Sequence, residues 1–116
     1  MKTEYFVEKI RKAIIDENDA IYRDLFNNTD IADATDEYWK KALSLFKSLD
    51  KDGQEALFEI MRQVSVDTLS NMFGVLDGVS SLENVHEEFK LTADDDESEV
   101  INGDLQDIFL EMEEDL

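Results

Sequence analysis

The side chains with the clearest chemical potential in this sequence are carboxylates, and they are densest after residue 90. One acidic run is followed by three acids at helical spacing, and together they comprise Asp94, Asp95, Asp96, Glu97, Glu99, Asp104, Asp107 and Glu111. Acids three and four positions apart share one face of a helix. Such a surface can attract a basic protein, imitate phosphates or hold a divalent cation, although a solvated, solubilising loop explains the run at 94–99 equally well. We predict that these residues bind a partner.

A second acidic stretch, residues 48–61, has the texture of a calcium-binding EF-hand loop but does not satisfy its ligand rules. That loop needs oxygen ligands at its first, third and fifth positions, glycine at the sixth and an acid at the twelfth. If Gly53 is placed sixth, the first position falls on Ser48. If Asp50 is placed first, the twelfth position falls on Met61. Neither register works, so we interpret the stretch as a capped turn between two helices and expect no metal site.

This chain contains few residues that could support histidine- or thiol-based chemistry. It has one histidine, His86, and no cysteine, which excludes disulfides, thiolate nucleophiles and thiolate metal sites. His86 lies opposite the apolar side of its segment, so we expect an exposed or rim position. No serine elbow, phosphate-binding glycine loop or dinucleotide fingerprint is present, and close carboxylate pairs are inevitable among 30 acids. We therefore expect no enzymatic activity and no cofactor.

Negative charge dominates the sequence and is unevenly distributed. Thirty acidic against eleven basic residues give a formal net charge of -19. Residues 1–82 contain 16 acids and 10 bases, a net of -6, whereas residues 83–116 contain 14 acids and 1 base, a net of -13. Binding to a phosphate backbone or an anionic membrane depends on Lys and Arg, so we expect neither as a direct partner. A basic protein is the natural partner.

The composition indicates one domain, residues 1–116, whose acidic part is 83–116. A hydrophobic content of 42%, with 7 Phe, 3 Tyr and 1 Trp, is sufficient for a core. No stretch approaches the length of a membrane span, and residues 1–15 lack the apolar run of a signal peptide. We expect a cytoplasmic location, a setting that suits a chain without disulfides.

The elements that must position these acids are mainly helical. Apolar residues recur at three- and four-residue spacings over 5–28, about 36–49, about 53–73 and 104–114, which predicts four amphipathic helices. The expected buried residues are, in order, Phe6, Ile10, Ala13, Ile14, Ile21, Leu25 and Phe26; Tyr38, Trp39, Ala42, Leu43, Phe46 and Leu49; Leu57, Phe58, Met61, Val64, Leu69, Met72 and Phe73; and Leu105, Ile108, Phe109 and Met112.

Helix ends and breaks can also be read from residue types. Thr35 or Asp36 can cap the second helix, and Asp52 with Glu55 has the spacing of a capping box before the third. The β-branched residues of Val64-Ser65-Val66 are expected to loosen or bend the third helix. Turn chemistry at 76–78 and 102–103 bounds a non-helical segment.

Between those breaks the periodicity changes. Val85, Phe89 and Leu91 alternate with polar residues, which indicates a strand, and residues 99–101 could form its partner across the acidic turn. The predicted fold is therefore a mainly α, compact bundle of about four helices. The sequence leaves open whether a small β-hairpin near residues 85–101 is added to this bundle.

The second half of the chain contains a distinctive series of short segments. They are Asp-Thr-Leu at 67–69, Val-Leu-Asp-Gly at 75–78, Phe-Lys-Leu at 89–91 and Asn-Gly-Asp-Leu-Gln-Asp-Ile-Phe-Leu at 102–110. This series, over about 66–110, resembles small acidic bacterial immunity proteins, including those of contact-dependent growth inhibition systems. The resemblance implies tight neutralisation of a specific, often basic, nuclease toxin. It fixes neither a fold nor any functional residue, because immunity proteins differ in fold and share no site motif that could be matched here.

These observations favour a module that neutralises a basic protein partner, with a cognate toxin as the expected partner. A nucleic-acid mimic that inhibits nucleic-acid-binding proteins is the first alternative, and a divalent-ion-binding module is the second. An enzyme ranks last. The sequence leaves the oligomeric state open.

Overall fold

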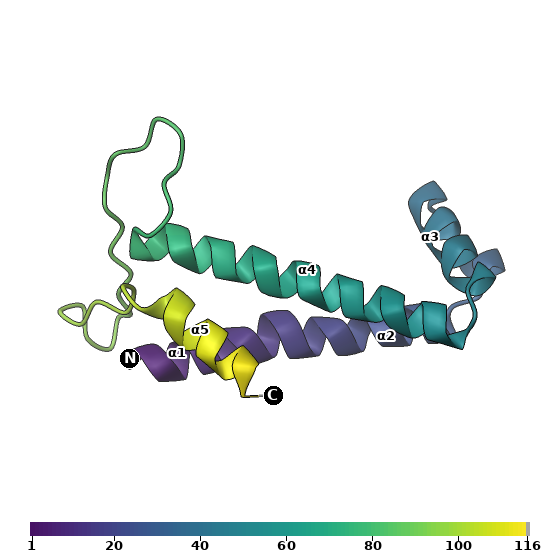
Figure 1. Cartoon of the computed structure of the whole chain (residues 1–116), viewed down its shortest axis with the longest axis horizontal. Helices are drawn as coiled ribbons and strands as arrows, with labels where there is room; N and C mark the ends of the chain where they lie inside the picture. Colours follow the sequence, from purple (N-terminus) through teal and green to yellow (C-terminus); the bar gives the residue numbers. More distant parts are fainter. Residues whose placement is uncertain (116) are drawn as a thin grey trace.

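The computed structural model describes residues 1–115 and is built from helices and loops (Figure 1). In chain order the elements are α1 (Thr3–Arg11), a π-helical segment η1 (Lys12–Asp16), α2 (Glu17–Asn28), a short 3-10 turn η2 (Ile31–Asp33), α3 (Glu37–Ser48), α4 (Lys51–Asp77) and α5 (Leu105–Glu114). Because α1, η1 and α2 follow one another without a break, they act as one long helix. The prediction of a mainly helical bundle of about four helices is therefore confirmed.

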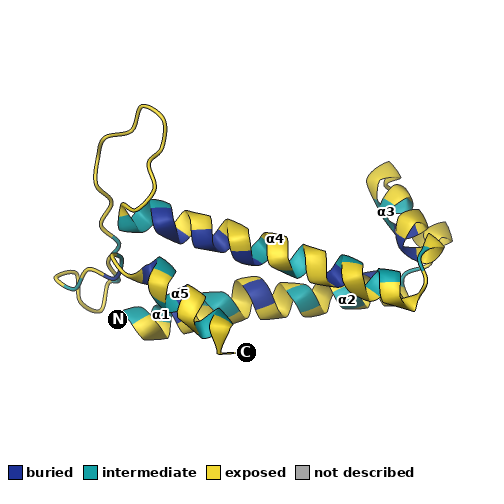
Figure 2. Cartoon of the chain, in the orientation of Figure 1, coloured by how far each residue is buried: buried dark blue, intermediate teal, exposed yellow. Residues whose placement is uncertain are grey.

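The bundle is elongated, with principal extents of 53 × 34 × 25 Å. The long helix α1–η1–α2 and helix α4 run beside each other, α5 lies across them near the N-terminus, and α3 stands at the opposite end (Figure 1). The buried residues, dark blue in Figure 2, form two separate groups. The first core contains Val7, Ile15, Val66, Leu69, Phe73, Ile101, Leu105 and Phe109. The second contains Phe26, Leu43, Phe46 and Phe58.

The π-helical segment changes which face of the first helix is buried. Val7 and Ile15 are fully buried in the first core, although helical spacing had not singled them out. Eight residues overshoot two turns of an α-helix, which has about 3.6 residues per turn. A π turn takes up an extra residue, so it brings Ile15 back toward the face that carries Val7. The predicted burial of Ile14 and Ile21 is accordingly wrong, because both are exposed. The predicted burial of four further residues is also wrong, since they are exposed on α2, α3 and α4: Leu25, Tyr38, Val64 and Met72.

Helix α4 is longer and more regular than the sequence indicated. Its N-cap is Asp50, whose side chain accepts a hydrogen bond from the Gly53 amide at 2.7 Å, so the capping box predicted from Asp52 is wrong by two positions. The helix continues through Val64-Ser65-Val66 and ends at Gly78, which has a φ of 79°. This left-handed conformation favours glycine. The cap predicted for the preceding helix is confirmed, since Asp36 accepts from the Tyr38 amide.

The predicted hairpin does not form, and among residues 1–115 there is no strand. Residues 79–104 are a long loop with two lobes, in which the Ile101 amide donates to the Leu91 carbonyl at 2.8 Å and Ala93 and Asp96 form an isolated bridge. The tight turn was therefore placed correctly, but the ladder does not extend from it. Residues 81–90 are all exposed. No other layer of residues 1–115 covers the apolar side chains that alternate in this segment, and an uncovered two-stranded hairpin is at best marginally stable.

A matched pair of valines on α4 tests this assignment of buried faces. Val66 is 6% exposed and Val64 is 58% exposed. We expect Val66→Ala to lower the free energy of unfolding by about 2 kcal/mol, through loss of buried apolar area. Val64→Ala should change it by less than about 0.5 kcal/mol. Urea denaturation followed by circular dichroism measures both, and equal effects would contradict the assignment.

Candidate functional site

The acidic run forms a tight turn beside the start of α1. Asp95 accepts a hydrogen bond from the α-amino group of Met1 at 3.1 Å, and Glu99 lies 3.5 Å from the Lys2 ammonium. The hydrogen bond from the Met1 amino group lowers the pKa of Asp95. Hydrogen bonds from the side chain and amide of Ser98 likewise lower the pKa of Asp96. Part of the acidic run at residues 94–99 thus holds the turn against the start of α1.

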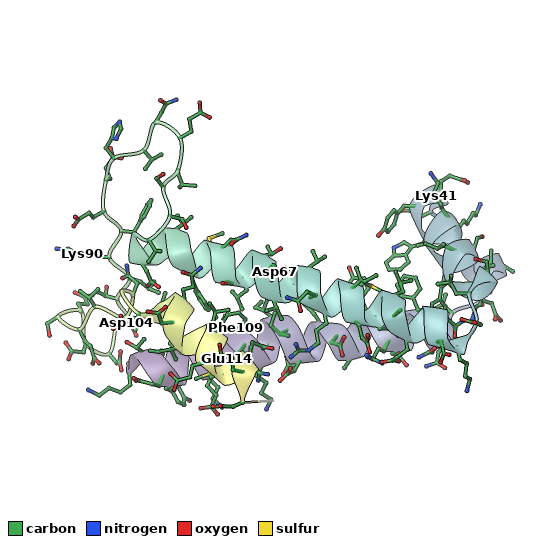
Figure 3. All side chains as sticks on the ribbon, viewed as in Figure 1. Lys41, Asp67, Lys90, Asp104, Phe109 and Glu114 are labelled. Atoms are coloured by element: carbon green, nitrogen blue, oxygen red, sulfur yellow. The ribbon has the colours of Figure 1, made fainter. Side chains whose placement is uncertain are left out.

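The remaining predicted acids face solvent. Asp94 and Glu97 are exposed in the turn, and Asp104, Asp107 and Glu111 are exposed along α5. The ribbon places the turn and the start of α5 at the same end of the molecule, close to Asp104 (Figure 3). The structure therefore brings the predicted residues to one end as two neighbouring groups, one on the turn and one on α5. We call these two groups together the acidic surface.

Helix α5 is held by groups that the sequence did not single out. The Asp77 carboxylate, at the end of α4, accepts from the amides of Gly103 and Gln106 at 2.6 and 2.8 Å. It thereby caps α5 from another helix, and Asp104, although it stands at the N-cap position, makes no side-chain cap. The Gln106 side chain donates to the Ser70 carbonyl at 2.9 Å. Because Asp77 of α4 caps α5, the Asp104 carboxylate stays available to a partner.

Asn102 connects the loop to the same end of α4. Its side-chain amide donates to the carbonyls of Leu76 and Phe89, and its side-chain oxygen accepts from the Leu91 amide. One side chain, just ahead of α5, therefore ties the end of α4 to the loop. Asparagine is common in turns, and the sequence predicts a turn at residues 102–103. The role of Asn102 as a junction depends instead on contacts 11 to 26 residues away.

The far end of α5 is fixed by an ionic network. Glu113 accepts from Arg11 at 2.8 Å and from Arg62 at 3.0 Å, and Asp16 also lies near both guanidinium groups. Burial raises the pKa of Glu113, but the hydrogen bonds from Arg62 and Arg11 outweigh it, and the net pKa is lowered. This network links α1, η1, α4 and α5. The sequence could not reveal it, because it forms only once α5 lies across the two long helices.

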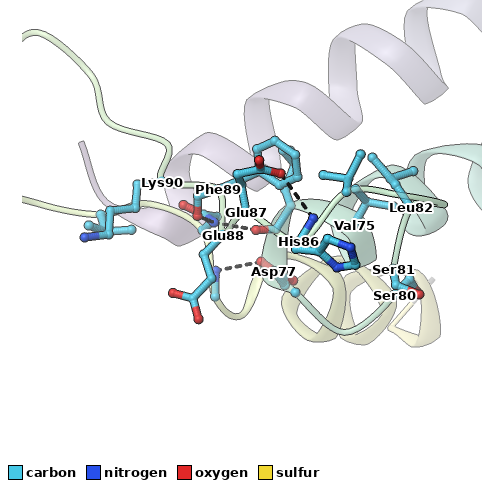
Figure 4. A pocket seen from close by; sticks show the side chains of 16 residues that line it. Val75, Asp77, Ser80, Ser81, Leu82, His86, Glu87, Glu88, Phe89 and Lys90 are labelled. Carbon is cyan, nitrogen blue, oxygen red and sulfur yellow. Dashed lines mark hydrogen bonds between the residues drawn. The ribbon is translucent and has the colours of Figure 1, made fainter.

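His86 lies in the outer lobe of the loop, in an exposed position as expected. The lobe borders a pocket of about 530 Å³, lined by His86, Glu87, Glu88 and Phe89 on one side and by Asp77 on another (Figure 4). The backbone amide of His86 donates to the Glu87 carboxylate at 3.1 Å. Within residues 1–115 the structure records no hydrogen bond to the imidazole ring itself.

Two further findings concern ions and membranes, and both apply to residues 1–115. No three side chains of His, Asp or Glu converge closely enough there to hold a metal ion. No helix there is long and apolar enough to cross a membrane. What the acidic surface can do chemically is present unpaired carboxylates to a cationic surface.

Comparison with protein-family models, with curated proteins and with solved structures yields no match.

The ionic network predicts a specific pH dependence. Glu113→Gln should lower the free energy of unfolding at pH 7 by about 2 kcal/mol, because it removes the charged acceptor of two arginines. The folded-state pKa of Glu113 lies below its ordinary value. Its stabilisation is therefore complete above the unfolded-state pKa, about 4.3, and is lost as pH falls through the lower folded-state pKa.

Urea denaturation across a pH series measures this effect as the difference between wild type and variant. The difference should be constant from pH 7 to about pH 5 and shrink below about pH 4. Glu114→Gln is the matched control, since Glu114 is the exposed neighbour on the same helix. A difference that persists unchanged at low pH, or that the control reproduces, would refute the role of Glu113.

Proposed function

We propose that this chain is an acidic protein-binding module that neutralises a basic protein, and that the partner is a toxin to which it confers immunity. The observation that supports this proposal best is the acidic surface. It lies in a segment with 14 acids and 1 base, and it includes exposed acids on both a fixed turn and a fixed helix. The likeness of residues 66–110 to immunity proteins supports the choice of a toxin.

The physical reason is the cost of holding like charges together. Asp104, Asp107 and Glu111 stand at three- and four-residue spacing, an arrangement that destabilises a helix in isolation. A cationic cleft, such as one that holds nucleic acid in a nuclease, would relieve that repulsion. The acidic surface bound there would in turn block the cleft. Complementary charge also raises the association rate, and this effect weakens as salt screens it.

Affinity capture from the source organism, followed by kinetics with the captured protein, tests the proposal. We expect a basic protein whose association rate falls about tenfold or more between low salt and 0.3 M salt, while its dissociation rate changes less. A flat association rate would contradict charge-steered binding. Co-expression tests the immunity role separately, because the captured protein should be toxic alone and harmless together with this chain. Inhibition of several unrelated nucleic-acid-binding proteins would instead indicate a nucleic-acid mimic.

Charge reversal on two matched helix faces tests the location of the surface. Asp107→Lys with Glu111→Lys should slow association with the captured partner by about tenfold or more. Glu4→Lys with Glu8→Lys is the control, since these acids are also exposed, also four residues apart and give the same change in charge. If both pairs slow association equally, net charge rather than the acidic surface directs binding.

A further inference from the structure

One stretch of the loop, residues 86–92, has backbone hydrogen-bond partners on one side only. It contains no helix, no turn and no positive φ. The Phe89 carbonyl accepts from the Asn102 side chain. The Leu91 amide donates to the Asn102 side-chain oxygen, and the Leu91 carbonyl accepts from the Ile101 amide at 2.8 Å. One side of the stretch is therefore bound to the residues that precede α5.

The other side of this stretch is free. Backbone groups of successive residues in an extended chain point to opposite sides, so those of Glu88 and Lys90 face away from Asn102. Within residues 1–115 these groups make no hydrogen bond, and neither side chain is in an ion pair. Both residues are exposed, the outer lobe stands out from the helices (Figure 1), and the Lys90 side chain points away from them (Figure 3).

Unpaired N–H and C=O groups along an extended segment are a template for pairing with another extended segment. We call residues 86–92 the free edge. The backbone thus specifies an extended occupant, and the side chains of the free edge decide which one.

Two copies of the free edge can pair with each other in only a few ways. In an antiparallel pair, the residues whose backbone groups face the partner strand lie opposite one another and exchange hydrogen bonds. On the free edge these outward residues are His86, Glu88 and Lys90. A two-fold symmetric pairing that joins at least two of them to one another has its axis at residue 87, 88 or 89.

One of these three registers avoids a contact between like charges. An axis at residue 87 places Glu87 opposite itself, and an axis at residue 88 places Glu88 opposite itself. An axis at residue 89 places each Glu88 opposite Lys90 of the other copy, and Phe89 opposite Phe89. Opposite-charge and aromatic pairs across two strands stabilise the pairing, whereas like charges directly opposite destabilise it. The sequence of the free edge is therefore complementary to itself about Phe89.

We propose that the free edge joins two copies of this chain in an antiparallel, two-fold symmetric pair centred on Phe89. Each Glu88–Lys90 pair exchanges backbone hydrogen bonds and forms an ion pair. Phe89 is 42% exposed, and its neighbour Leu91 packs against the first core, so the second copy covers apolar surface beside that core. This inference does not depend on the proposed function, because the free edge is a different surface from the acidic surface.

The charge of the whole chain opposes this association and sets its strength. Two chains of net charge -19 repel each other, but salt screens that repulsion beyond about 8 Å at physiological ionic strength. Contacts within the paired edges act at shorter range than this. A two-stranded ribbon is also a small interface, and small interfaces are weak. We therefore expect a weak dimer that becomes stronger as salt rises from low concentration to about 0.15 M.

Sedimentation velocity of the full chain at about 0.15 M salt, from about 10 µM to about 1 mM protein, tests the proposal with three variants. Glu88→Lys places lysine opposite Lys90, and Lys90→Glu places glutamate opposite Glu88. Each should raise the dimer dissociation constant about tenfold, because two attractive pairs become repulsive. The double variant Glu88→Lys, Lys90→Glu restores opposite charges across the pair and should return to within about threefold of the wild type.

Glu83→Lys is the matched control. Glu83 is an exposed acid of the same lobe outside the free edge, and its reversal changes the net charge as Glu88→Lys does. Both substitutions make the chain less negative, so both should strengthen the dimer if net charge alone acts. All these positions are exposed in the loop, so circular dichroism should show unchanged helix content in every variant.

Each outcome of this experiment bears on the proposal. A concentration-dependent dimer, weakened by each single reversal at the free edge and recovered in the double variant, supports it. A chain that stays monomeric up to about 1 mM would overturn it. So would a dimer that Glu88→Lys strengthens as Glu83→Lys does, or one that none of the variants affects, because the copies would then meet at another surface. None of these results alters the test of the acidic surface, which measures association with a captured basic protein.

Discussion

Helix α4 contributes to both cores of the molecule, and this double role constrains everything else. Phe58 near its start packs with α2 and α3, whereas Val66, Leu69 and Phe73 pack with α1 and α5. The helix has 27 residues and is therefore about 40 Å long. Residues 79–104 form a loop and α5 has only 10 residues, so no further helix of residues 1–115 lies along the middle of that rod. The chain covers the two ends with α5 and α3 and leaves the middle as a two-helix section.

Charged residues that form ion pairs between elements are also unevenly distributed along the chain. The arginines that touch carboxylates on other elements, Arg11, Arg23 and Arg62, all lie before residue 83. They pair with acids at the joints between helices, part-buried at Glu113 and exposed at Glu55. Within 83–116 the single base, Lys90, cannot do the same for 14 acids. Helix α5 can nevertheless carry a row of exposed acids, because buried Leu105 and Phe109 and the paired Glu113 hold its other side.

Sequence patterns predicted the helices well because amphipathic periodicity and local caps are properties of neighbouring residues. They failed where a distant contact or an inserted residue decides the outcome. The π-helical segment moved the buried face of the first helix to Val7 and Ile15, which a search for regular spacing cannot detect. The hairpin failed because nothing packs on residues 81–90. The acidic residues could be found from composition, but Asp77, Asn102 and Glu113, which fix their positions, act through partners far away in the sequence.

The acidic surface extends from the turn at residues 94–99 along α5 as far as Glu111. A ten-residue helix spans about 15 Å, which exceeds the Debye length of about 8 Å at physiological salt. Charges at the turn and at Asp104 are therefore largely screened from those in the last turn of α5. An approaching cationic protein would be oriented by the acidic surface, which mainly affects the rate of association.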